Sequence, residues 1–148
     1  MFPKILVGYD GSKGAKAALE CAAVMARDYK AEITALWVRE PLPRHSDLPG
    51  EFEGEQEAAD EYFKERFQEV LGVAKQHGID IRCEMRAGHP AKAIVKRADE
   101  GGYDLIVAGH SDHSELWGRL LGDTADRISD HAHCSVLIVK QHPTPTQS

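Results

Sequence analysis

Short apolar stretches alternate with helical patterns along this chain, and the alternation limits the folds it can adopt. Segments whose apolar residues recur every three or four positions are typical of helices with one buried face. They separate five strand-like segments at residues 4–9, 32–38, 79–85, 104–108 and 135–140. Parallel strands need such helical crossovers, which are right-handed and cover both faces of a sheet. The sequence therefore predicts one α/β domain with an open, doubly wound parallel sheet of five strands, in the order 3-2-1-4-5.

Four helices are predicted to divide between the two faces of this sheet. The inward face of the first, which follows Ser12, is expected to be formed by Ala15, Leu19, Ala22, Ala23 and Ala26. The second should run from about Gln56 to His77, with an inward face of Phe63, Phe67, Val70, Leu71 and Ala74. The third follows Pro90 and should bury Ala91, Ile94, Val95 and Ala98; the last begins near Thr124 and should bury Ala125, Ile128 and Ala132. Residues 40–54 are rich in proline and glycine and are expected to form a long loop, and a disordered tail at 141–148 should follow the domain of residues 1–140.

The overall charge and the cysteines exclude several classes of function. A net charge of −6 argues against nucleic acid or an anionic membrane as a partner, because both require a basic face. No apolar run approaches the length of a membrane span, and Ile5-Leu-Val7 is too short for a signal peptide. The cysteines, Cys21, Cys83 and Cys134, are odd in number and lack metal-ligand spacing, so we expect buried free thiols in a reducing cytoplasm.

A ligand site is predicted where the strand order reverses. In open parallel sheets, ligands bind beyond the carboxyl ends of the strands at this point, which here lies between the first and fourth strands. Asp10 and the loop that starts at Gly109 should therefore face each other. A glycine lets backbone amides approach a bound group, and the helix that starts near Thr124 presents free N–H groups to a phosphate.

Several motifs, taken together in this order and spacing, resemble the universal stress protein family over nearly the whole chain. They are Lys4-Ile-Leu-Val7 with Asp10-Gly-Ser12, Gly88-His-Pro90 before a helix, Asp104-Leu-Ile-Val-Ala-Gly109, the long loop to Gly122, and His131-Ala-His-Cys-Ser-Val-Leu-Ile-Val139. The resemblance implies an open α/β sheet and a homodimer joined through the last strand. An apolar strand at a sheet edge would also favour a twofold mate, here through Val136, Leu137, Ile138 and Val139.

In the family that this chain resembles, some members bind ATP with Gly-x-x-Gly, nine residues, Gly and Ser or Thr. This chain has Gly109-x-x-Asp112, nine residues, and Gly122-Asp123, so aspartates replace the second glycine and the hydroxyl. As an N-cap of the last helix, Asp123 would place a carboxylate on the amides that a phosphate would use, and Asp112 adds a second charge. A triphosphate would be repelled unless a divalent cation bridged it. We therefore expect weak or absent ATP binding, and adenosine or AMP should suffer less from this repulsion because they carry fewer phosphate charges.

The other residues of the predicted nucleotide site are Asp10, Gly11, Ser12, Val38, His110 and Thr124. Asp10 could hydrogen-bond a ribose or an adenine amino group, or simply close a turn onto the amide of Ser12. Val38 could present its backbone to an adenine edge, and Thr124 could replace the missing hydroxyl from one position further on. His110, Asp112 and His113 could bind a metal, although we favour a solvated polar loop and assign no metal site.

The predicted function is a cytoplasmic, homodimeric stress-response regulator that acts on a protein partner not named by the sequence and carries a degenerate adenine-nucleotide site. The alternative is an ATP- or AMP-binding member with metal-assisted phosphate binding or slow nucleotide hydrolysis. Enzymatic activity ranks lower because no catalytic residue is identifiable: there is no Gly-x4-Gly-Lys phosphate loop, no Ser-His-Asp order, and no cationic clamp for a γ-phosphate. A phospho-acceptor receiver domain is disfavoured because the third strand ends at Glu84-Met-Arg86, without an aspartate.

Overall fold

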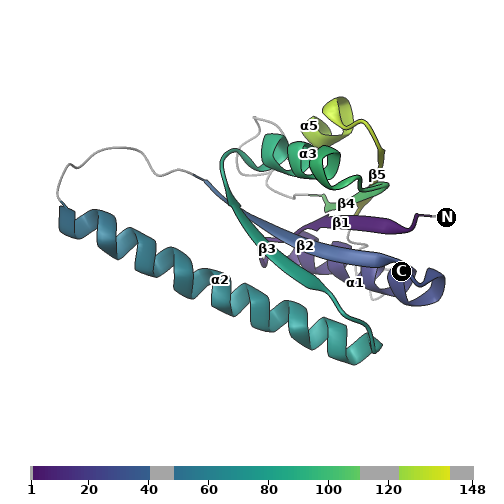
Figure 1. The fold of residues 1–148 in the computed structure, drawn as a ribbon, viewed down its shortest axis with the longest axis horizontal. Coiled ribbons are helices and arrows are strands. Elements are labelled where there is room, and N and C mark those ends of the chain that lie inside the picture. Colours follow the sequence, from purple (N-terminus) through teal and green to yellow (C-terminus); the bar gives the residue numbers. More distant parts are fainter. Residues whose placement is uncertain (1, 41–48, 111–123, 141–148) are drawn as a thin grey trace, which may run out of the picture.

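A computed structural model describes residues 2–40, 49–110 and 124–140 of the chain. Strands and helices alternate along it (Figure 1). In chain order they are β1 (Lys4–Gly8), α1 (Lys13–Tyr29), β2 (Glu32–Arg39), α2 (Pro49–His77), β3 (Arg82–Ala87), α3 (Pro90–Gly101), β4 (Leu105–Gly109), α5 (Thr124–His131) and β5 (Ser135–Val139).

The strands form one five-stranded sheet in the order β3-β2-β1-β4-β5, and every pair of neighbours is parallel. Strand β1 lies at the centre, where Leu6 pairs with Thr34 of β2 on one side and with Ile106 of β4 on the other. Both Leu6 and Ile106 are fully buried. Central parallel strands are covered on both faces, which explains their continuous apolar sequences. The predicted fold class and strand order are confirmed.

In the described part of the chain, two helices cover each face of the sheet, so the core has two halves (Figure 1). On one face α1 and α2 pack, and all five inward residues predicted for α1 are buried, with Ala18 in addition. On the other face α3 and α5 bury Ile94, Ala98, Ala125 and Ile128, while Ala91, Val95 and Ala132 pack half-buried against them. The four-helix arrangement is confirmed.

Helix α2 differs from its prediction at its start and on its inward face. It begins at Pro49 rather than near Gln56, because proline is well suited to the first turn of a helix. Val70 and Ala74 are buried as predicted, but Phe67 and Leu71 are 36% and 39% exposed. The helix packs against α1 and against the edge of the sheet at β2 and β3. Its buried stripe is therefore narrower than the apolar stripe in the sequence.

Strand β3 begins at Arg82, later than the predicted Ile79. The amide of Ile79 donates to the Ala74 carbonyl at 3.0 Å, after Gly78 has taken a positive φ of 67°. The amide of Ile79 is therefore bonded within the turn that ends α2, and it does not pair with β2. The strand lies at the sheet edge, as its alternating pattern predicted.

The three cysteines are free, but each is half-buried rather than buried as predicted. They lie on α1, on the edge strand β3 and just before the other edge strand β5, where packing covers one side only. Within the described ranges, no helix is long and apolar enough to cross a membrane. The predicted tail at 141–148 lies outside the described residues.

Candidate functional site

A cleft of about 650 Å³ opens at the carboxyl ends of β1, β2 and β4, where the strand order reverses. Six of the ten predicted site residues line it: Asp10, Ser12, Val38, Gly109, His110 and Thr124. Gly11 lies in the same loop but not on the cleft wall. The remaining three, Asp112, Gly122 and Asp123, lie outside the described residues. The sheet thus brings residues from three strand ends and one helix start to a single cleft.

Asp10 and Ser12 organise the turn between β1 and α1. One carboxylate oxygen of Asp10 accepts a hydrogen bond from the Ser12 amide at 2.9 Å. The Ser12 hydroxyl accepts one from the Ala15 amide at 3.2 Å and so caps α1. This turn uses one of the two Asp10 oxygens, and the side chain is exposed at the cleft. Asp10 therefore serves the turn and can still meet a ligand from the same position.

Gly109 brings the end of β4 into direct contact with the first turn of α1. A Cβ atom added to Gly109 would lie far inside van der Waals contact of the Gly14 carbonyl. One added to Gly14 would lie 2.8 Å from the carbonyl oxygen of His110. Gly14 was not among the predicted site residues, although a glycine in the first turn of a helix, where it is disfavoured, was a usable signal. Because both residues lack a Cβ atom, the end of β4 and the first turn of α1 can approach closely beside the cleft.

Two aromatic side chains outside the predicted site also line the cleft. Trp37 on β2 and Tyr62 on α2 form a tilted pair with ring centroids 4.8 Å apart. The Tyr62 hydroxyl donates to the backbone carbonyl of Asp10 at 2.7 Å. Trp37 could have been suspected from its place beside Val38, but the α2 residue that reaches the cleft depends on how the helix crosses the sheet.

A polar network joins α2 to the end of β1 behind this wall. The Tyr9 hydroxyl donates to Glu69 at 2.6 Å, and Arg66 donates to the same carboxylate at 2.8 and 3.1 Å. Burial, reinforced by the hydrogen bond to Glu69, raises the pKa of the Tyr9 phenol well above its usual range. Burial would raise the pKa of Glu69, but the hydrogen bonds from Tyr9 and Arg66 hold it below its usual range. Glu69 is therefore a carboxylate at neutral pH, and it holds both donors in place.

The hypothetical metal site at His110, Asp112 and His113 falls mostly outside the described residues. Within the described part of the chain, no three histidine, cysteine or acidic side chains gather as metal ligands would.

Solved structures share this fold over nearly their whole length. The hypothetical protein MJ0577 is 26% identical, with a TM-score of 0.78 over 97% of this chain and 99% of that one. A universal stress protein in complex with cAMP is 24% identical, with a TM-score of 0.70 over 94% and 97%. A universal stress protein family protein from Arabidopsis thaliana with AMP bound is 17% identical, with a TM-score of 0.69 over 98% and 99%.

Similarity in sequence to known proteins adds to the similarity in fold. The universal stress protein MJ0531 of Methanocaldococcus jannaschii is 37% identical over 145 residues, which span 95% of this chain and 84% of the relative. The sequence profile of the universal stress protein family matches residues 1–140, the part of the chain that contains the sheet, its four helices and the cleft. With sequence, strand order and cleft position in agreement, this chain belongs to the universal stress protein family.

Proposed function

We propose that this chain is a cytoplasmic stress-response regulator that binds an adenine nucleotide in the cleft between β1 and β4 and acts through a protein partner. The observation that carries the proposal is the convergence of Asp10, Val38 and Gly109 on one cleft at the reversal of strand order, where α/β sheets bind their ligands. Two proteins of this fold have cAMP or AMP bound, which agrees with an adenine-nucleotide ligand.

The cleft offers a chemically suitable partner for each part of AMP. Val38 adjoins the aromatic Trp37, so a purine can bond to backbone groups and pack against a ring. The exposed Asp10 carboxylate can accept hydrogen bonds from ribose hydroxyls. Lys13 lines the cleft and carries positive charge, and α5 begins at Thr124, so its first amides can face a phosphate. The longer ATP would bring its terminal phosphates to the segment that carries Asp112 and Asp123, and a divalent cation would then be needed.

Calorimetric titration with AMP tests this site directly. We expect wild-type protein to bind AMP, and Asp10→Asn to weaken binding about fivefold to tenfold, because hydrogen bonds to a charged acceptor are stronger by about 1 kcal/mol than those to a neutral one. The amide can still accept from Ser12, so the turn survives. Asp80→Asn, at an exposed position before β3, is the matched control and should leave affinity unchanged. Absence of AMP binding at about 1 mM would refute the proposed nucleotide binding. An Asp10→Asn variant with the affinity of wild type would show that Asp10 does not contact the ligand.

The proposed regulator is a homodimer through β5. This strand forms one edge of the sheet, and Val136, Leu137, Ile138 and Val139 are half-buried in the single chain. A second copy related by a twofold axis would cover them. We expect a dimer by sedimentation at micromolar concentration. Ile138→Lys should raise its dissociation constant at least about a hundredfold, because it buries an unpaired charge.

Val24→Lys is the control for the dimer, since Val24 is a 37% exposed apolar residue on α1. It should leave sedimentation unchanged, and circular dichroism should confirm that both variants fold. A wild-type monomer, or a dimer that tolerates Ile138→Lys, would contradict an interface through β5.

A further inference from the structure

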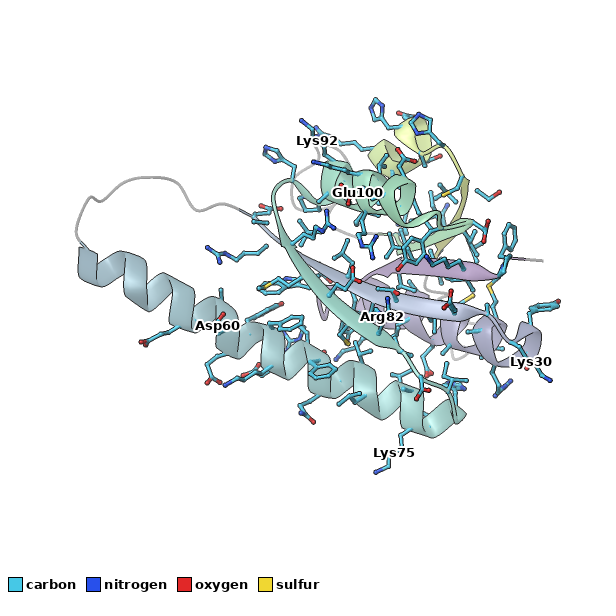
Figure 2. The ribbon with its side chains drawn as sticks, in the orientation of Figure 1. Lys30, Asp60, Lys75, Arg82, Lys92 and Glu100 are labelled. Carbon is cyan, nitrogen blue, oxygen red and sulfur yellow. The ribbon has the colours of Figure 1, made fainter. Side chains whose placement is uncertain are left out.

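Helix α2 is longer than the part of the sheet that it covers. It has 29 residues, and its N-terminal part extends beyond the sheet edge (Figure 1). Asp60 lies along this part, far from Lys75 at the other end of the helix, where β3 begins (Figure 2). Among residues 57–62, Ala59 is the one buried residue. This part of α2 is held by the buried Ala59, by the Phe63 ring that stacks on Trp37 at a centroid distance of 6.2 Å, and by Tyr62.

Tyr62 is the side chain through which this part of α2 meets the cleft. Its hydroxyl donates to the Asp10 carbonyl at 2.7 Å, and its ring lies 4.8 Å from that of Trp37. The Arg66 guanidinium lies 4.2 Å from the centroid of the Tyr62 ring. Tyr62 also lines the cleft and is 38% exposed. One side chain thus both lines the cleft and links α2 to the residues that follow β1.

The next turns of α2 are anchored in the core as well as by a polar network. Glu69 binds Tyr9 and Arg66, and Val70 and Ala74 are buried in the core. Tyr9 also lines the cleft, and Arg66 contacts the Tyr62 ring. Val70 and Ala74 lie in the core and do not line the cleft. The helix therefore has a C-terminal part that is packed in the core and an N-terminal part whose contact with the cleft lining is made by Tyr62.

We propose that Tyr62 is a positioning residue that couples occupancy of the cleft to the docking of the N-terminal part of α2. A nucleotide that packs against Tyr62 and Trp37 contacts the docked form of the helix and loses those contacts when the helix lifts. Such differential contact shifts the equilibrium towards the docked form, and by linkage a docked helix binds the nucleotide more tightly. The proposal rests on the proposed function and names the element through which a partner could sense the ligand.

Hydrogen exchange of the whole protein, with and without AMP, tests this coupling. Without ligand, Tyr62→Phe should speed exchange of amides 57–66 about fivefold, the factor that one hydrogen bond of about 1 kcal/mol supplies. In wild-type protein, AMP should slow exchange both in the turn at residues 10–15 and in residues 57–66. In Tyr62→Ala, AMP should still protect residues 10–15 but no longer protect 57–66. Tyr29→Phe, on a tyrosine that is 62% exposed at the end of α1, should behave as wild type.

The outcomes separate this proposal from the proposed function. Protection of residues 10–15 by AMP without protection of 57–66 in wild type would overturn the coupling and leave nucleotide binding standing. Unchanged exchange of ligand-free Tyr62→Phe would overturn the role of the hydrogen bond whatever AMP does. If calorimetry detected no binding of AMP to wild-type protein, both the proposed nucleotide binding and the coupling would be refuted.

Discussion

Gly109→Ala is expected to lower the free energy of unfolding by about 3 kcal/mol or more. The new methyl group would overlap the backbone carbonyl of Gly14 and approach the Ala15 amide nitrogen to 2.9 Å. Overpacking costs about 1 to 3 kcal/mol when side chains can rotate away, and backbone atoms at a helix start cannot. The end of β4 would have to move away from α1. Urea unfolding followed by circular dichroism measures the loss.

Gly72→Ala is the matched control because it makes the same chemical change in open space. Gly72 lies within α2 and is exposed, and an added Cβ would meet no atom within 4 Å. Alanine favours helix more than glycine by about 0.5 to 1 kcal/mol, so this variant should be more stable than wild type. The free energy of unfolding should therefore fall in Gly109→Ala and rise in Gly72→Ala. A neutral Gly109→Ala would mean that β4 and α1 are not in tight contact at this point.

Replacing Asp112 and Asp123, the two aspartates of the Gly109–Asp123 motif, is expected to raise ATP affinity about a hundredfold in the absence of Mg²⁺. Asp112 and Asp123 occupy the positions where the related motif has a glycine and a hydroxyl residue, so both carboxylates would adjoin the phosphates. Each like charge at a few ångströms costs on the order of 1 to 4 kcal/mol, depending on solvent exposure. Asp112→Gly combined with Asp123→Ser removes both. AMP should gain less than ATP, because it brings fewer charges to the loop.

Calorimetry with ATP and with AMP, each with and without Mg²⁺, measures this effect. Asp28→Asn combined with Asp80→Asn is the control, since it changes the net charge equally at exposed positions outside the cleft lining. Mg²⁺ should reduce the difference in ATP affinity between wild type and the variant that combines Asp112→Gly with Asp123→Ser. Tight metal-independent ATP binding by wild type, or no gain in the variant, would show that these aspartates do not govern the site.

The strand order, the two helical layers and the position of the cleft were predictable from the sequence. Alternating strands and helices with right-handed crossovers leave few arrangements, and buried strands reveal themselves by short apolar runs. The ends of such runs are local features. Asp10, Val38 and Gly109 could therefore be assigned to one cleft from the sequence, and all three line it.

The contribution of α2 to the site was decided by the tertiary structure. Periodicity marked Phe67 and Leu71 as inward, yet both are exposed, while Tyr62, outside the apolar stripe, reaches the cleft. Which face of a helix is buried depends on the angle and height at which it crosses the sheet. That crossing results from many weak contacts with α1, β2 and β3, which no local pattern encodes.

The sequence by itself determined where the strands end, and thereby which residues of β1, β2 and β4 can meet a ligand, because strand ends follow from local apolar runs and the glycines that stop them. Only the tertiary structure decided that the backbones of Gly14 and Gly109 approach each other closely and that Tyr62 lines the cleft. Both contacts join segments far apart in the chain, so their existence depends on how completed elements pack.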